Sequence, residues 1–74
     1  IVVAIGMDGH TVKSGTIATN KNIDLTKIYQ YLRKQGYNSG GHKTVGGFQA
    51  LKNKTLEQTL QDLRNAIKQT QNQT

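Results

Sequence analysis

The chain has 74 residues, enough for one small domain, and it carries ten Lys and Arg residues against four Asp and Glu residues, for a net charge of +6. It contains no Cys, which excludes a disulfide framework, a cysteine metal site and thiol chemistry. The positive charge favours an anionic partner such as a nucleic acid or a phosphorylated small molecule. The alternative is a solvated surface without such a partner, because the basic residues are dispersed along the chain.

No apolar run approaches the ~20 residues that a membrane-spanning helix requires, and no secretory segment with a cleavage site precedes the first predicted strand. With no cysteine in the chain, these features predict a soluble, cytoplasmic domain without membrane contact. The sequence starts at Ile1 without Met and enters strand-like residues at once. We therefore expect a piece of a longer polypeptide, which shares its function with residues upstream.

The first elements are predicted to form a β-hairpin. The run IVVAIGM is typical of a short buried strand, and Asp8-Gly9 after it favours a type I′ turn, whose central residues both have positive φ. The return strand is HTVKSGTIAT. Val12 and Ile17 lie on opposite sides of its alternation, so a bulge at Gly15 is expected to turn both inward.

A helix is predicted over about residues 24–35. Asp24 stands at the N-cap position, and Gly36 supplies the left-handed residue after the last turn. Arg33 and Lys34 complement the helix dipole in that last turn. The apolar stripe that should face the sheet consists of Leu25, Ile28, Tyr29 and Leu32.

Extended sequence resumes at FQAL and continues through Leu51, and a second helix follows. Thr55 and Gln58 have the spacing of a capping box at its start. Its apolar face is predicted to contain Leu56, Leu60, Leu63 and Ile67. Residues 1–70 then form the domain, and the polar tail 71–74 is expected to fray. The order β-β-α-β-α predicts an α+β fold with α/β-like layers, in which two helices pack on a small mixed β-sheet.

The stretch SGGHKTVGGFQ, Ser39 to Gln49, contains four of the eight glycines and is predicted to begin as a loop. Glycine amides can approach an anion closely and form a concave nest, while His42 and Lys43 add an imidazole donor and a point charge. These residue types favour phosphate binding, although a tight turn alone would also use glycines. Gly46-Gly47-Phe48 is predicted to be a closely packed strand. The spacing matches neither the Walker loop nor G-x-G-x-x-G.

The segment GGHKTVGGF, Gly40 to Phe48, resembles the G-G-G-H-x-x-A-A-G-F signature of the DHHA1 domain, the C-terminal substrate-binding domain of DHH-family phosphoesterases. The likeness extends over Val12–Ile67, where TVKSGTIAT, NIDLTKIYQYL and LEQTLQDLRNAI occur in the family's order. The superfamily includes RecJ-like single-strand exonucleases, oligoribonucleases, phosphatases acting on 3′-phosphoadenosine 5′-phosphate, and cyclic-dinucleotide phosphodiesterases.

The resemblance implies that Gly40, Gly41 and His42 hold a substrate phosphate and present it to a dinuclear manganese site on an upstream DHH domain. The expected partners are then that domain and a single-stranded nucleic acid or phosphorylated nucleotide. No set of residues here matches the family's metal ligands, so the chain alone should bind substrate without hydrolysing it. The alternative is a stand-alone nucleic-acid-binding or oligomerisation module, including a homodimer, with no catalytic role.

The sequence departs from the family pattern at three places. Ser39 replaces the first glycine of the triplet, and Val45 and Gly46 replace the two alanines. Ala18-Thr19 stands where many members have an Arg-Ser pair that reaches a nucleotide phosphate. More of the contact with phosphate is therefore expected from lysines: Lys13, Lys21 and Lys43.

The tyrosines divide between core and surface. Tyr29 is predicted to be buried together with Phe48, and Tyr31 to be exposed on the helix. Tyr37, directly after the helix-ending glycine, is the candidate for stacking on a base. The predicted substrate-binding residues are therefore Tyr37, Ser39, Gly40, Gly41, His42 and Lys43.

Two other chemistries are disfavoured by the residues themselves. Asp8, His10 and His42 could be considered metal ligands, but the D-G turn already accounts for Asp8, and two histidines rarely suffice. Ser14 or Ser39 with His42 could be considered a nucleophilic pair, but Ser39 precedes a glycine turn and has no strand-to-helix elbow around it.

Overall fold

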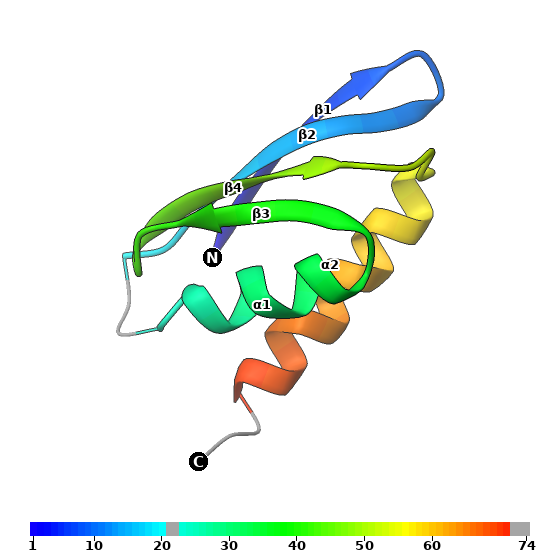
Figure 1. The fold of residues 1–74 in the computed structure, drawn as a ribbon. Coiled ribbons are helices and arrows are strands. Elements are labelled where there is room, and N and C mark those ends of the chain that lie inside the picture. Colours follow the sequence, from blue (N-terminus) through cyan, green and yellow to red (C-terminus); the bar gives the residue numbers. More distant parts are fainter. Residues whose placement is uncertain (21–22, 72–74) are drawn as a thin grey trace.

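The computed structural model describes residues 1–20 and 23–71 and shows a four-stranded sheet with two helices (Figure 1). The α+β class is confirmed. The elements are β1 (Val2–Asp8), β2 (Thr11–Ala18), α1 (Thr26–Lys34), β3 (Tyr37–Gly41), β4 (Val45–Ala50) and α2 (Leu56–Gln71).

The sheet has the strand order β1-β2-β4-β3, and every neighbouring pair is antiparallel, so the predicted mixed sheet is wrong. The element order is β-β-α-β-β-α, because Tyr37–Gly41 forms a strand where we expected a loop. This strand pairs with β4 through a short turn, and antiparallel strands need no longer connection. Gly40 lies opposite Gly47 and Gly41 opposite Gly46, so the glycines of the two strands face one another.

Both helices cover the same face of the sheet (Figure 1). Helix α1 packs mainly on β3, and α2 packs beside α1 and reaches β2. The core therefore lies between one sheet face and the helix pair. It consists of Val12, Ile17, Leu25, Ile28, Tyr29, Leu32, Tyr37, Phe48, Leu63 and Ala66.

Strand β1 is an edge strand, and the expectation that it is buried is wrong. Val2 and Met7 are exposed, and only Val3 and Ile5 pack partly against the core. The helices lie over β3, β4 and part of β2, and within the described residues neither helix contacts β1. Strand β2 is the single strand beside β1. The apolar run in the sequence therefore predicts the strand correctly but does not predict whether the strand is buried.

The β1–β2 turn differs from the predicted type. Asp8 and Thr11 are paired across the strands, so the two residues of the loop are Gly9 and His10. Gly9 has φ 63°, and no non-glycine residue in the described part of the chain has positive φ. The type I′ assignment of Asp8-Gly9 is therefore wrong, because Asp8 belongs to the strand.

A bulge turns both apolar residues of β2 inward, as expected, but it lies at Lys13 instead of Gly15. The register between β1 and β2 shifts so that Lys13 has no partner, and Val12 and Ile17 are both buried. Gly15 has a different role, because an added Cβ there would collide with the ring of Phe48. That glycine lets the aromatic ring lie close against β2.

Helix α1 is shorter than the predicted range, and its N-cap residue is Leu25, so the prediction that Asp24 stands at the N-cap position is wrong. Asp24 nevertheless bonds to the first turn of the helix. The Asp24 Oδ1 atom accepts a hydrogen bond from the Thr26 amide at 3.0 Å and another from the Thr26 hydroxyl. These bonds, with Lys43 nearby, hold the pKa of Asp24 below its usual value. Gly36 follows the helix with φ 97°. All members of the predicted apolar stripe are fully buried: Leu25, Ile28, Tyr29 and Leu32.

Helix α2 begins with the predicted capping box. The Thr55 amide donates to Gln58 Oε1 at 3.0 Å, and the Gln58 amide donates to Thr55 Oγ1 at 3.1 Å. The predicted apolar face is partly wrong, because Leu56 and Leu60 are exposed. The buried side chains of the helix are instead Thr59, Leu63 and Ala66. Within the described residues, no helix is long and apolar enough to cross a membrane.

Candidate phosphate-binding hairpin

The structure brings four of the predicted substrate-binding residues together at one end of the sheet. Gly40 and Gly41 end β3, and His42 and Lys43 begin the turn that leads into β4. This turn and the β1–β2 turn lie at opposite ends of the sheet (Figure 1). The side chains of His42 and Lys43 are exposed.

The carbonyl groups of the β3–β4 turn are all tied to the body of the protein. The Tyr29 hydroxyl donates to the His42 carbonyl at 2.8 Å. The Leu25 amide donates to the Lys43 carbonyl at 3.0 Å, and the Thr19 amide donates to the Thr44 carbonyl at 2.9 Å. Three successive carbonyl oxygens therefore face inward, toward α1, its N-terminus and the end of β2.

The amides of the same turn face the other way. In a trans peptide the N–H group points opposite to the preceding carbonyl, and the described residues contain no cis peptide bond. The inward carbonyls of His42 and Lys43 therefore turn the N–H groups of Lys43 and Thr44 outward. Within the described part of the chain, neither N–H group has a hydrogen-bond acceptor. Successive outward amides of this kind form an anion-binding concavity.

Tyr29 is the side chain that fixes this orientation most directly. Burial raises the pKa of Tyr29, and the Asp24 carboxylate adds to that effect, so the hydroxyl keeps its proton and acts as a donor. The hydroxyl reaches the turn across Gly46, where an added Cβ would collide with it. Gly46 is therefore required for the contact between Tyr29 and the turn.

The glycines of the hairpin have separable roles. Gly41 has φ 144°, and an added Cβ would collide with the Cα atom of Gly46. An added Cβ at Gly47 would stand 2.9 Å from the Gly15 carbonyl oxygen, so Gly47 also serves close packing. Gly40 is different, because the only atom near an added Cβ is a guanidinium nitrogen of Arg33, at 3.3 Å. Gly40 is thus the glycine that packing of the backbone does not require.

Arg33 is a neighbour of the hairpin that the sequence pattern did not reveal. Its Nε atom donates to the Ser39 carbonyl at 2.6 Å. We had expected Arg33 only to complement the helix dipole. The available signal was its position four residues after Tyr29, because residues i and i+4 share one side of a helix.

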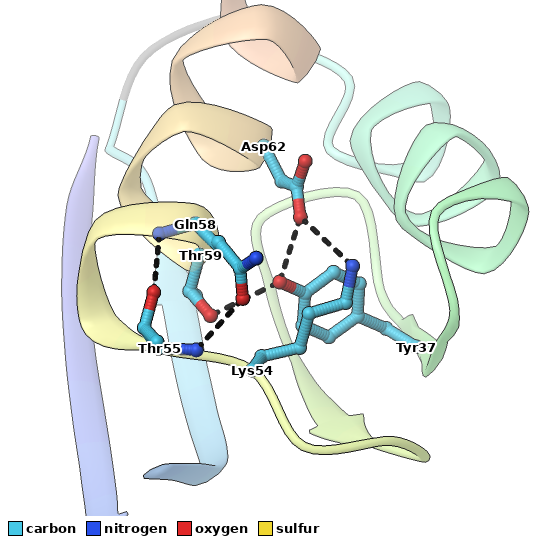
Figure 2. A network of polar contacts seen from close by, with 6 residues as sticks. All are labelled: Tyr37, Lys54, Thr55, Gln58, Thr59 and Asp62. Atoms are coloured by element: carbon cyan, nitrogen blue, oxygen red, sulfur yellow. Dashed lines mark hydrogen bonds and ion pairs between the residues drawn. The ribbon is translucent and has the colours of Figure 1, made fainter. Parts of the chain in front are cut away.

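The prediction that Tyr37 offers a stacking surface is wrong. Its side chain is 1% exposed, and its ring meets Phe48 edge to face with a centroid distance of 5.7 Å. The hydroxyl donates to Asp62 Oδ2 at 2.8 Å and lies 3.0 Å from Thr59 Oγ1 (Figure 2). Burial, together with Asp62, raises the pKa of Tyr37 to about 12. The ring points into the helix layer as soon as the chain leaves Gly36.

Lys54 completes the polar cluster around Tyr37. Its Nζ atom lies 3.6 Å from Asp62 Oδ2 and 5.3 Å from the centroid of the tyrosine ring (Figure 2). The ammonium group thus balances the carboxylate that accepts the Tyr37 hydrogen bond. This cluster joins the start of β3 to α2 and serves packing.

The Ser39 side chain also faces inward, so it is not placed to touch a ligand. It is 5% exposed, and its hydroxyl donates to the Gly47 carbonyl at 2.9 Å. Lys13 lies about 16 Å along β2 from Ala18, at the rise of ~3.3 Å per strand residue, and therefore far from the β3–β4 turn. Lys21 lies outside the described residues.

The groups that the hairpin turns outward can donate hydrogen bonds to an anion. The outward groups are amides, an imidazole and cationic side chains, which suit phosphate oxygens. Asp8 and His10 lie at the other turn from His42, and the described residues contain no group of three His, Cys, Asp or Glu side chains that could hold a metal.

A shallow hollow lies at the same end of the sheet. Its volume is about 290 Å³, and it is lined by Ile1, Val2, Ala18, Thr19 and Asn20. The amide of Thr19 is the one bonded to the turn, so the hollow adjoins the hairpin. Ala18 and Thr19 thus place small side chains beside the hairpin.

Comparisons of the chain with protein-family models, with curated proteins and with solved structures found no match.

Proposed function

We propose that this chain is a DHHA1-type substrate-binding domain of a DHH-family phosphoesterase, and that it binds a terminal phosphate of a short single-stranded nucleic acid or nucleotide at the β3–β4 turn. The observation that carries the proposal is the orientation of this turn. Its carbonyls are bound inside the protein, so the Lys43 and Thr44 amides point outward, beside the exposed side chains of His42 and Lys43.

In this proposal the chain positions the phosphate and does not cut it. The amides of Lys43 and Thr44 and the imidazole of His42 orient the phosphate oxygens and stabilise the negative charge that develops on them. Manganese ions bound to an upstream DHH domain would supply the activated water. The expected setting is cytoplasmic, and the partners are that domain and the phosphorylated substrate.

The test uses the ¹⁵N-labelled chain and two thymidine trinucleotides, one phosphorylated at both ends and one with hydroxyl ends. The phosphorylated probe should bind more tightly and shift the amide signals of Lys43 and Thr44. His42→Ala should weaken its binding by about tenfold, because a charge-assisted hydrogen bond to phosphate is lost. His10→Ala is the matched control, since His10 is exposed in the opposite turn. Equal binding of the two probes by the unaltered chain, or equal effects of the two substitutions, would contradict the proposal.

A second candidate is a nucleic-acid-binding module without a defined phosphate site. A hollow of about 140 Å³ between the helices favours it, because two lysines border that hollow; the lining residues are Lys27, Gln30, Tyr31, Lys34, Gln69 and Thr70. Binding spread over such cations would fall steeply with salt for both trinucleotides and would change little on His42→Ala. Measuring the affinity for both trinucleotides at several salt concentrations separates this function from the first.

A further inference from the structure

Arg33 holds its guanidinium group at the outer edge of β3. The strand is at the edge of the sheet, and the Arg33 Nε atom is bonded to the Ser39 carbonyl on that edge at 2.6 Å. Its Nη2 atom lies beside Gly40, as the 3.3 Å distance to an added Cβ shows. Within the described part of the chain, no carboxylate forms an ion pair with Arg33. The terminal nitrogens of the guanidinium are therefore available to an anion.

The Gly41 amide points toward the same edge. The bonds from the His42 amide to the Val45 carbonyl and from the Leu51 amide to the Gly36 carbonyl mark the bonded pairs at the two ends of the hairpin. Alternation along an antiparallel pair makes Gly40 and Gly47 a bonded pair as well, with the Gly40 carbonyl directed at β4. The N–H group of Gly41 then faces away from β4.

Gly40 keeps this edge open. Successive strand residues face opposite sides, and Ser39 faces the helices, so a side chain at residue 40 would project on the other side of the strand. There it would stand against the Arg33 guanidinium. The absence of a side chain leaves the guanidinium accessible beside the Gly41 amide.

We propose that Arg33 is a phosphate-binding residue, which together with the Gly41 amide binds oxygens of the ligand phosphate at the outer edge of β3. The planar guanidinium matches a phosphate, since its parallel N–H groups can contact two oxygens at once. This inference deepens the proposed function and rests on it, because it extends the site from the turn onto the strand.

The experiment compares Arg33→Gln with Lys34→Gln in the 74-residue chain, using the phosphorylated and hydroxyl-ended trinucleotides. Both substitutions remove one positive charge from the last turn of α1, and Lys34 is exposed. Glutamine keeps an N–H donor for the Ser39 carbonyl. Arg33→Gln should reduce the affinity for the phosphorylated probe about tenfold and leave the hydroxyl-ended probe within about twofold. Lys34→Gln should change both by less than about twofold.

Two further measurements keep the inference testable if Arg33→Gln disturbs the hairpin. The phosphorylated probe should shift the Arg33 Nε–H and Gly41 amide signals of the unaltered chain. Gly40→Ala should weaken phosphate-dependent binding several-fold while the fold remains, because only the flexible end of Arg33 is close to the new methyl group.

The outcomes separate the two proposals. If the unaltered chain binds both probes equally, the proposed function fails. If it prefers the phosphorylated probe and loses that preference on His42→Ala, while Arg33→Gln behaves like Lys34→Gln and the Gly41 signal stays unshifted, the function stands and the role of Arg33 is overturned.

Discussion

The two β-hairpins of this protein each place an exposed histidine in a short turn, yet they differ in how the turn is held. At the β1–β2 turn, the side-chain hydrogen bond is local, from Thr11 Oγ1 to the Asp8 carbonyl at 3.0 Å. At the β3–β4 turn, the carbonyls from His42 to Thr44 are bound by distant segments. Among the described residues, no distant segment bonds to the carbonyls of the β1–β2 turn, so the backbone around the histidine is held by the rest of the protein in the β3–β4 turn and not in the β1–β2 turn.

The largest effect on the β3–β4 turn is expected when the approach of Tyr29 to this turn is blocked. Gly46→Ala places a methyl group on the Tyr29 hydroxyl and close to the Gly40 carbonyl, so the hairpin or α1 must shift. We expect the free energy of unfolding to fall by about 3 kcal/mol or more, as for overpacked buried sites. Chemical denaturation followed by circular dichroism measures this change.

Gly6→Ala in β1 is the matched control for Gly46→Ala. An added Cβ at Gly6 has its nearest contacts with Ser14 at an ordinary 3.6 Å, and Gly6 is exposed. The stability of this variant should therefore stay within about 1 kcal/mol of the parent. Similar losses in the two variants would show that the hairpins do not differ in their demand for glycine.

The features that were predictable from the sequence are the ones encoded locally. The apolar stripe of α1, the helix-ending Gly36 and the Thr55–Gln58 capping box all involve residues within one element or its ends. Strand β3 was missed because its sequence, YNSGG, has no apolar alternation. It exists through pairing with β4 and packing on α1, which are tertiary interactions.

The candidate site was predictable in its residues but not in its geometry. Gly40, Gly41, His42 and Lys43 stood out by type. The outward direction of the turn amides depends on Thr19, Leu25 and Tyr29, which lie far away in the sequence. Tyr37 was misplaced because a tyrosine after a helix-ending glycine can point either to solvent or to the core. The Tyr37 side chain points to the core because its hydroxyl bonds to Asp62 and Thr59 of α2.

The other end of the β3–β4 hairpin should be sensitive to alkaline pH through Tyr37. Its pKa is raised to about 12 in the folded state, chiefly by burial, from an ordinary value of 10.0. The protonated form is therefore favoured by folding, and this contribution to stability is complete below pH 10 and is lost as the pH rises toward 12. The loss should be about 2 to 3 kcal/mol.

Tyr37→Phe separates this effect from the titration of lysines. The variant should be about 1 to 2 kcal/mol less stable than the parent at pH 8, because it leaves Asp62 and Thr59 without the tyrosine hydroxyl. Between pH 10 and 12 its stability should fall less than that of the parent. Urea denaturation across this pH range measures both, and parallel pH curves for the two chains would rule out the tyrosine as the source.

A smaller change should loosen the β3–β4 turn without displacing any atom of the hairpin. Tyr29→Phe removes the hydrogen bond to the His42 carbonyl and keeps the buried ring, so the free energy of unfolding should fall by about 1 kcal/mol. Phosphate-dependent binding should weaken several-fold, because the amide of Lys43 is then less firmly directed outward. Tyr31 lies in the same helix and is half-buried, so the prediction that it is exposed is wrong, and Tyr31→Phe should change neither property. If Tyr29→Phe lowers stability while phosphate-dependent binding is unchanged, the binding does not depend on the outward direction of the Lys43 and Thr44 amides, and the fixed backbone is not what makes this turn a phosphate site.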